Sequence, residues 1–254
     1  MLWKINTIND RLYFLKIFYI HKTKTFMTLF EIGKKYPTNK NISGFIHIYE
    51  SYFSPLKEKK INILEIGVDN GDSLRLWRDY FPNANICGID ILKKDFKINN
   101  VEIMYGDQSD ENFLSTIIEK YKKFDIIIDD GSHISKHIIQ SFTYLFDYLN
   151  DNGIYVVEDL QTSYFPRYGG NRLNLKNNKT SMNFLKSLTD SVNYEHKDRP
   201  FFKRNKFDGF IKSVNFHQNI VFIKKGKSVN YFYNNTYNNT FLEKIKKFIS
   251  LIFN

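Results

Sequence analysis

The stretch INILEIGVDNGDSLRLW, residues 61–77, decides the fold. An apolar run ends in Glu65, Gly67 and Gly71 follow, and a helix-like segment comes next. This order predicts a strand, a tight glycine turn and a helix at the edge of a nucleotide pocket. We expect glycine there because a Cβ would block the close approach of a ligand to the backbone. The spacing Glu-x-Gly-x-x-x-Gly differs from the Gly-x-Gly-x-x-Gly of dinucleotide sites, and it favours S-adenosylmethionine, which has no pyrophosphate.

Strand-like and helix-like segments alternate through the middle of the chain. The predicted strands are 61–67, 84–90, 101–107, 124–130 and 153–159, and the predicted helices between them are 72–81, 110–121 and 135–149. Because the strands are nearly continuous apolar runs, they predict a parallel sheet covered by helices on both faces. Residues 210–216 and 219–225 predict an antiparallel hairpin that closes this Rossmann-like α/β sheet of seven strands.

Composition limits the class of protein. The 254 residues suit one α/β domain with extensions, or two small domains, and the 42% hydrophobic content argues against general disorder. The net charge of +10 fits nucleic acid, an anionic membrane or an anionic substrate, although the abundance of Lys, Asn, Ile and Phe also fits coding bias. Cys87 is the single cysteine, which suits a reducing cytoplasm. We expect neither a membrane span nor a signal peptide.

Three regions are expected. Residues 1–60 form an N-terminal helical extension, 61–230 the main domain and 231–254 a basic amphipathic tail. The tail could dock on its own protein, on a partner subunit or on a membrane surface. Residues 161–180 predict a long loop of the kind that shapes a substrate site, and a helix is expected over 181–192.

Acidic residues recur where the predicted strands end. They are Glu65, Asp90, Asp107, Asp129, Asp130, Glu158 and Asp159. The carboxyl ends of parallel strands meet at one edge of a sheet, where ligands bind. Helix capping would explain one or two of these acids but not two adjacent pairs.

Three of the polar strand-end residues suit the nucleoside part of a ligand. Asp90 follows the glycine turn at a distance that suits a ribose diol, because its two oxygens can each accept from one hydroxyl. Asp107 and Gln108 could meet the adenine end. The alternative for each is a solvated loop residue.

Asp130, Glu158 and Asp159 would converge if the fourth and fifth strands are neighbours. Three clustered carboxylates repel one another, and a hard divalent cation such as Mg²⁺, Mn²⁺ or Ca²⁺ resolves the conflict better than Zn²⁺. His133 lies beside this group and could take a proton from a substrate hydroxyl, or it could simply bond to the loop. His137 is expected to be a packing or surface residue.

The segments 64–91, 124–133 and 153–170 together resemble the metal-dependent class I methyltransferases that act on sugar hydroxyls of macrolide antibiotics, and the related cephalosporin-hydroxylase-like group. The resemblance spans roughly residues 28–225. It implies the class I fold, S-adenosylmethionine as cofactor, Mg²⁺ held by Asp130, Glu158 and Asp159, and His133 as general base. The family usually carries Thr-Asp-Lys before the first strand, whereas this chain has Thr38, Asn39 and Lys40.

These observations predict a Mg²⁺-dependent O-methyltransferase acting on a sugar or on a surface-polysaccharide-linked oxygen, either a hydroxyl or a phosphate-type group, for example in capsule synthesis. The predicted cofactor-binding residues are Glu65, Gly67, Gly71, Ser73, Asp90, Asp107, Gln108 and Asp129; the catalytic ones are His133 and Asp130; and the acceptor-binding ones are Tyr164, Arg167 and Tyr168. A homo-oligomer is left open.

Three other functions remain as alternatives. The positive charge fits a nucleic-acid methyltransferase, but no Asn/Asp-Pro-Pro-Tyr stretch follows the fourth strand. A non-catalytic binding protein with the same fold would not need the complete set of Asp130, His133, Glu158 and Asp159. A hydroxylase would need two histidines and one carboxylate for iron, and the sequence does not provide them in a recognisable pattern.

Overall fold

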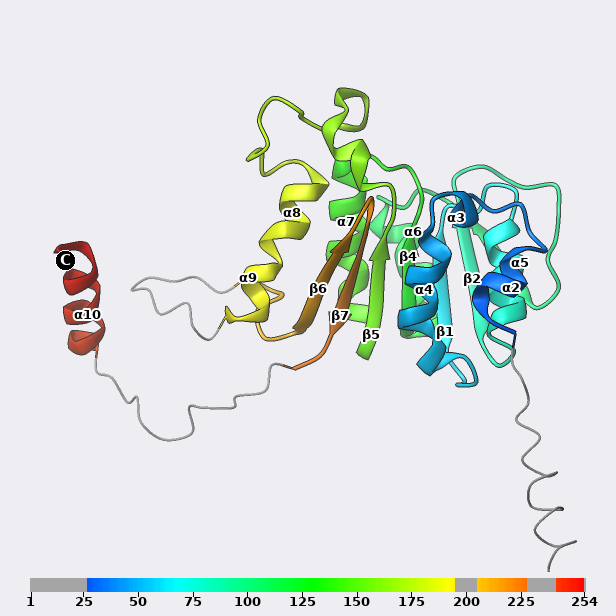
Figure 1. The fold of residues 1–254 in the computed structure, drawn as a ribbon, viewed down its shortest axis with the longest axis horizontal. Coiled ribbons are helices and arrows are strands. Elements are labelled where there is room, and N and C mark those ends of the chain that lie inside the picture. Colours follow the sequence, from blue (N-terminus) through cyan, green and yellow to red (C-terminus); the bar gives the residue numbers. More distant parts are fainter. Residues whose placement is uncertain (1–26, 195–204, 228–240, 254) are drawn as a thin grey trace, which may run out of the picture.

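The computed structural model describes residues 27–194, 205–227 and 241–253 and contains a seven-stranded sheet (Figure 1). The strand order is β3-β2-β1-β4-β5-β7-β6. The strands are β1 Asn62–Ile66, β2 Asn85–Asp90, β3 Val101–Tyr105, β4 Phe124–Asp129, β5 Leu149–Val157, β6 Ile211–His217 and β7 Ile220–Lys225. Strands β1 to β5 pair in parallel, and β7 runs antiparallel to both β5 and β6. The predicted mostly parallel α/β sheet with a C-terminal antiparallel hairpin is confirmed.

Helices cover both faces of the sheet. The helices in the described ranges are α2 Leu29–Gly33, α3 Asn39–Ile42, α4 Phe45–Phe53, α5 Asp72–Tyr80, α6 Glu111–Tyr121, α7 Ser135–Leu145, α8 Ser181–Ser187, α9 Thr189–Val192 and α10 Phe241–Phe253, of which α10 lies apart from the sheet in Figure 1. Short 3₁₀ turns lie at Ser54–Leu56, Phe146–Tyr148, Leu160–Tyr164 and Pro166–Tyr168.

Two cores result from the alternation of side chains along the strands. Ile127 packs on one face, among side chains from α6, α7 and α8, while its neighbours Ile126 and Ile128 pack on the other face with α2, α4 and α5. Since successive strand residues point to opposite faces, an apolar run buries both of its sides. This is why the central strands read as continuous apolar segments.

Some predicted boundaries were wrong, and the helix expected over 181–192 is divided into α8 and α9. The helix expected over 135–149 ends at Leu145, and β5 begins at Leu149 rather than at Gly153. Leu149 pairs with Phe124, after which the register shifts, and Asn152 adopts a left-handed φ of 65°. A polar segment that reads as a turn is therefore an irregular beginning of the strand.

The described part of the N-terminal extension belongs to the same core as the sheet. Leu29, Phe45 and Tyr49 from α2 and α4 are buried with Trp77 of α5. Residues 1–26, and residues 231–240 of the predicted tail, lie outside the described residues. No helix in the described ranges is long and apolar enough to cross a membrane.

Candidate functional site

The strand order places a ligand site beside β1 and β4. The chain extends outward from β1 through β2 and β3, and then returns to β4 on the other side. Ligands of open parallel sheets bind outside the carboxyl ends of the strands at such a point. The register pairs Ile66 with Asp129 and Asp129 with Val157. Gly67, Asp130 and Glu158 therefore follow in one row just beyond the three strand ends.

The glycines of the first turn are required by the protein's own packing. Gly67 has a φ of +91°, and a Cβ on it would lie 2.2 Å from the backbone oxygen of Asp130. Gly71 has a φ of +77°, and its Cβ would lie 2.7 Å from the ring of Phe96. Close approach of a ligand was the reason expected from the sequence. In this structure the neighbouring chain segments already fill the space that a Cβ would need.

Asp90 fastens the glycine turn. Its Oδ2 accepts from the backbone N–H groups of Val68 and Asp69, at 3.0 and 3.2 Å, and lies 2.9 Å from Nζ of Lys94. Its Oδ1 accepts from the Leu92 N–H at 2.8 Å. Burial acts to raise the pKa of Asp90, but these donors lower it below its ordinary value. The carboxylate thus stays ionised beside the turn, and its bond to a ribose stays a prediction.

A second network supports the loop after β4. The buried Asp129 accepts from Oγ of Ser141 at 2.8 Å and from Nε2 of Gln108 at 3.1 Å. Oε1 of Gln108 accepts from the Ser132 N–H at 2.7 Å. Burial raises the pKa of Asp129, while Ser141 and Gln108 act to lower it. Gln108 and Asp129 were predicted to bind the cofactor. Here their polar atoms hold the 131–133 turn, and a cofactor role for them stays a prediction.

The structure places the other predicted cofactor-binding residues around these two networks. Oγ of Ser73 donates to Oε2 of the buried Glu65 at 2.9 Å. Asp107 accepts from the backbone and hydroxyl of Ser109, both at 2.8 Å, which closes the turn after β3 and lowers the pKa of Asp107. Ser73 and Glu65 are thus brought together at the glycine turn, and Asp107 shapes the neighbouring one.

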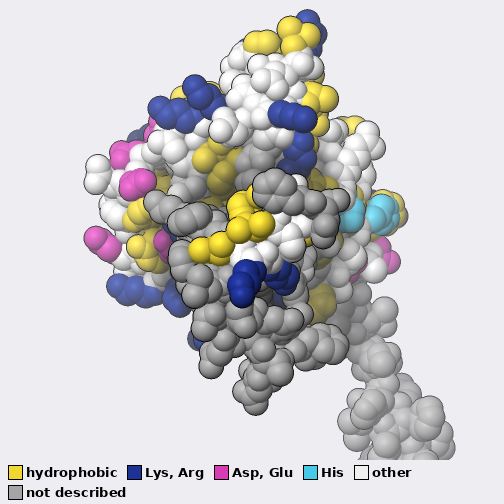
Figure 2. All heavy atoms as spheres, turned by 90° about the vertical axis from the view of Figure 1, so that its left-hand side faces the viewer, with side chains coloured by type: hydrophobic (Ala, Val, Ile, Leu, Met, Phe, Trp, Pro, Cys, Tyr) yellow, Lys and Arg dark blue, Asp and Glu magenta, His cyan; other side chains and the backbone are white. Residues whose placement is uncertain are grey.

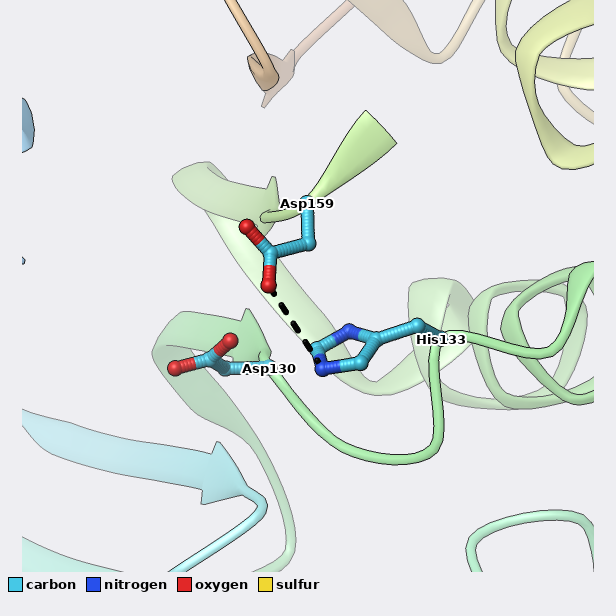
Figure 3. Close-up of side chains that lie close together, drawn as sticks. All are labelled: Asp130, His133 and Asp159. Carbon is cyan, nitrogen blue, oxygen red and sulfur yellow. Dashed lines mark ion pairs between the residues drawn. The ribbon is translucent and has the colours of Figure 1, made fainter. Parts of the chain in front are cut away.

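Asp130, His133 and Asp159 form a cluster that could hold a metal ion (Figure 3). Asp130 follows β4, Asp159 follows β5, and His133 lies in the turn before α7. Each offers one ligand atom, and these atoms lie within 4.8 Å of one another. Nε2 of His133 is 3.6 Å from Oδ2 of Asp159. All three side chains are partly exposed, so a substrate could reach them.

Two members of the cluster have an unusual backbone. His133 has a φ of 57° and Asp159 a φ of 52°, in the left-handed region that non-glycine residues seldom adopt. Such a conformation persists only where the surrounding structure imposes it, and it occurs often at functional sites. Oγ of Thr162 accordingly donates to the backbone oxygens of both Asp159, at 2.7 Å, and His133, at 3.3 Å.

Glu158 was predicted as a metal ligand, but one of its oxygens is engaged elsewhere. Its Oε1 accepts from Nζ of Lys40 at 2.6 Å and from the hydroxyl of Tyr49 at 2.5 Å. Burial and then the charge of Asp130 raise the pKa of Glu158, while Lys40 and Tyr49 act to lower it. Lys40 and Tyr49 were not among the predicted site residues. The Thr38-Asn39-Lys40 turn was the available signal for Lys40, and Tyr49 had none because it reads as a core aromatic.

The predicted acceptor residues separate into two groups. The ring of Tyr168 lies 6.4 Å from that of His133, and the guanidinium of Arg167 stacks over Tyr168 at 4.7 Å. Tyr164 instead lines a cavity of about 50 Å³ together with Asn171, Asn183 and further residues of the same region. The structure therefore brings Tyr168 beside the predicted base, with Arg167 stacked on Tyr168, and places Tyr164 at the wall of this cavity.

Comparison with solved structures decides the type of fold. The methyltransferase MycE from the mycinamycin biosynthetic pathway, in complex with Mg and SAH, superposes with a TM-score of 0.77 and is 32% identical, over 87% of this chain and 60% of that chain. This chain has the class I methyltransferase fold. No protein-family model matches it.

Curated relatives agree with the structural comparison. The mycinamicin VI 2''-O-methyltransferase of Micromonospora griseorubida is 35% identical over 79% of this chain. An 8-demethyl-8-alpha-L-rhamnosyl tetracenomycin-C 2'-O-methyltransferase of Streptomyces olivaceus is 38% identical over 72% of it. The chain spans about half the length of these curated relatives, 53% and 50% respectively.

Proposed function

We propose that this chain carries the catalytic machinery of an S-adenosylmethionine-dependent, Mg²⁺-dependent O-methyltransferase that acts on a sugar hydroxyl. One observation carries the proposal: Asp130, His133 and Asp159 come together beyond β4 and β5, beside the glycine turn, on a fold shared with a Mg- and SAH-bound methyltransferase. The named relatives, one of which acts on a rhamnosyl compound, support a sugar as acceptor.

The cofactor would lie over the glycine turn. The Gly67–Gly71 segment is held by Asp90, and Glu65 with Ser73 lies beneath it. S-adenosylmethionine supplies a methyl group that is already activated by its sulfonium. The task left to the protein is therefore mainly to position the donor and the acceptor in line.

The metal would be held by carboxylates at the carboxyl ends of β4 and β5. Asp130 and Asp159 belong to the described cluster, and Glu158 lies beside Asp130. An oxygen-rich donor set suits a hard divalent cation such as Mg²⁺. Bound there, the cation would lower the pKa of the acceptor hydroxyl.

His133 is the proposed base. Its Nε2 takes the hydroxyl proton while the acceptor oxygen forms its bond to the methyl carbon, and the electron pair of the broken carbon–sulfur bond stays on sulfur. Oδ2 of Asp159, at 3.6 Å, would stabilise the imidazolium that results. The left-handed backbone of His133 sets the direction in which its side chain leaves the turn.

The loop after β5 would bind the acceptor. Tyr168 offers a ring for stacking against a sugar, and Arg167 offers donors for its oxygens. In Figure 2 this loop protrudes at the top of the molecule and carries hydrophobic and basic side chains. Leu173 and Leu175 are exposed there, by 93% and 56%. Such a surface suits a glycoside whose other part is apolar.

The proposal is tested by transfer of a labelled methyl group in the presence of Mg²⁺. The acceptors are a rhamnosyl polyketide, a nucleotide-linked sugar, a sugar phosphate and a surface polysaccharide. His133→Asn is the key variant because asparagine tolerates the left-handed backbone. It should bind S-adenosylhomocysteine normally and lose turnover by about 10²- to 10⁴-fold. His137→Asn, a matched control on α7, should remain active. Full turnover in His133→Asn would remove His133 as the base.

The finer predictions from the sequence remain part of this proposal. They are a surface-polysaccharide or phosphate-type acceptor, the likeness to the cephalosporin-hydroxylase-like group, a cytoplasmic location, the homo-oligomer, the contact of the tail with a membrane and the three-part division of the chain. Gel filtration and flotation with anionic vesicles test the homo-oligomer and the membrane contact.

A further inference from the structure

Lys40 lies between carboxylates from three strand ends. Its Nζ is 2.6 Å from Oε1 of Glu158, 2.8 Å from Oδ2 of Asp130 and 3.4 Å from Oε1 of Glu65. The lysine side chain is only 2% exposed. The three carboxylates within 3.4 Å favour the ammonium form of this buried amine. A buried, fixed cation therefore sits directly behind the candidate metal cluster.

Lys40 donates to one carboxylate oxygen of Glu158 and to one of Asp130, and it does not bond to the second oxygen of either residue. On Glu158, Lys40 and Tyr49 both donate to Oε1. On Asp130, Lys40 donates to Oδ2. No described residue donates a side-chain hydrogen bond to Oε2 of Glu158 or to Oδ1 of Asp130. Each carboxylate thus has one oxygen bonded to the lysine and one that accepts no side-chain hydrogen bond from a described residue.

This division of oxygens matters for the choice of metal. Mg²⁺ is small and demands near-ideal octahedral geometry with one oxygen from each ligand, whereas Ca²⁺ accepts carboxylates that bind through both oxygens. A carboxylate with one oxygen already bonded to an ammonium can offer a metal only the other. The pair therefore suits Mg²⁺ and disfavours Ca²⁺.

We propose that Lys40 is a positioning residue that limits Asp130 and Glu158 to one metal-facing oxygen each, and thereby makes the site select Mg²⁺ over Ca²⁺. The inference rests on the proposed Mg²⁺-dependent function. Lys40 touches neither acceptor nor donor in this assignment. It acts through the two acids, and its conformation is set by the short helix α3, where Thr38 accepts the Lys40 N–H at 3.3 Å.

A purely neutralising role for Lys40 makes a different prediction. Three carboxylates, those of Glu65, Asp130 and Glu158, surround Lys40. If the ammonium only offset their charge, its loss would change the affinities for Mg²⁺ and Ca²⁺ by the same factor. If it sets the binding mode, its loss changes the ratio of the two affinities. The ratio is therefore the deciding quantity.

The test is calorimetric titration of the protein with Mg²⁺ and with Ca²⁺, without methyl donor or acceptor. The wild type should bind Mg²⁺ more tightly. Lys40→Met should shift the ratio of dissociation constants toward Ca²⁺ by about 10-fold, the lower end of the change in affinity that follows removal of a partner of a metal ligand. Lys120→Gln, which removes an exposed lysine from Glu102 and leaves the site intact, should keep the wild-type ratio.

A second variant guards against misfolding of Lys40→Met. Tyr49→Phe removes the other donor to Oε1 of Glu158, and should shift the ratio in the same direction by a smaller factor. Infrared spectra should show the carboxylate bands of Ca²⁺-loaded Lys40→Met change toward two-oxygen binding. An unchanged ratio in both variants would overturn the role of Lys40 alone. Asp159→Asn serves as the control for binding at the proposed site and should abolish the binding of both ions. If the wild type binds neither ion, or if Asp159→Asn binds them as the wild type does, the proposed metal-dependent function fails as well.

Discussion

Substitution of Gly67 by alanine should damage the site through the backbone of Asp130. The new Cβ would lie 2.2 Å from the Asp130 carbonyl oxygen, and ordinary contact begins at 3.4 Å, so the two must separate by about 1 Å. The left-handed φ of +91° adds about 1–2 kcal/mol for any residue with a Cβ. Moving Asp130 would also strain the hydrogen bond from its N–H to the Ile66 oxygen, which contributes about 1 kcal/mol.

Gly44 provides a matched control. It has a similar φ of +75°, but a Cβ on it would meet nothing within 4 Å. The free energy of unfolding of Gly44→Ala should therefore fall only by the cost of the left-handed backbone, about 1–2 kcal/mol. Gly67→Ala should lose about 3 kcal/mol or more, since it adds the clash and the strained hydrogen bond.

Urea-induced unfolding, followed by circular dichroism, measures both losses. Titration with Mg²⁺ measures the second consequence, because Asp130 supplies a proposed ligand. We expect weaker binding in Gly67→Ala and unchanged binding in Gly44→Ala. Equal losses of stability in the two variants would refute the reasoning, because the contact with Asp130 would then cost nothing.

Three further predictions follow from the site. Burial and then the charge of Asp130 raise the pKa of Glu158 to about 8 from its ordinary value of 4.5. Between these two pH values, Glu158 of the metal-free folded protein keeps its proton, whereas Glu158 of the unfolded chain releases it. Metal-free protein should therefore lose stability as the pH rises from about 5 to 8, by at most about 5 kcal/mol, and Glu158→Gln should flatten this slope in thermal melts. Gln108→Leu should lower the free energy of unfolding, measured in urea, by about 1–3 kcal/mol, because the Ser132 N–H and the Asp129 carboxylate each lose a hydrogen-bond partner. A decrease below about 0.5 kcal/mol would show that water replaces the amide. Treatment with EDTA should abolish methyl transfer but spare S-adenosylhomocysteine binding, and Mg²⁺ should restore activity; full activity in metal-free protein would exclude the proposed role of the metal.

The strand ends could be predicted because apolar runs that stop at an acid leave little freedom. Each central strand is buried on both faces, so the place where its apolar run ends is visible in the sequence, although the irregular beginning of β5 was not. The parallel order then places Asp130 and Asp159 at one edge without further information. The grouping of these two acids with His133 could thus be anticipated from residues close to one another in the chain.

The orientation of Asp129 could also be predicted from the sequence, although Asp129 was interpreted as a cofactor-binding residue. Asp129 lies two residues after Ile127 on the same strand, and Ile127 packs against the face that α7 covers. By the two-residue period of a strand, Asp129 must point to that face too, where Ser141 of α7 meets it. An acid at a strand end is therefore not always aimed at the ligand.

The likeness of the Thr38-Asn39-Lys40 turn to the family's Thr-Asp-Lys pointed to Lys40, but it did not show which residues Lys40 contacts. Lys40 is 90 residues away from Asp130 and 118 from Glu158 along the chain. A lysine in a polar turn reads as a solvated surface residue. Only the packing of α3 and α4 beside the sheet brings it over the strand ends.

The register of β1, β4 and β5 has a consequence for how this protein can change in length. Gly67, Asp130 and Glu158 form one row because Ile66, Asp129 and Val157 are paired across the sheet. Insertion or deletion of one residue within β4 would turn its following side chains to the opposite face and move Asp130 out of the row. A residue gained or lost in the turn 81–84, at the amino end of β2 and so at the opposite edge of the sheet, would leave it intact. Related sequences should therefore vary in loop length but keep these three strands at constant length.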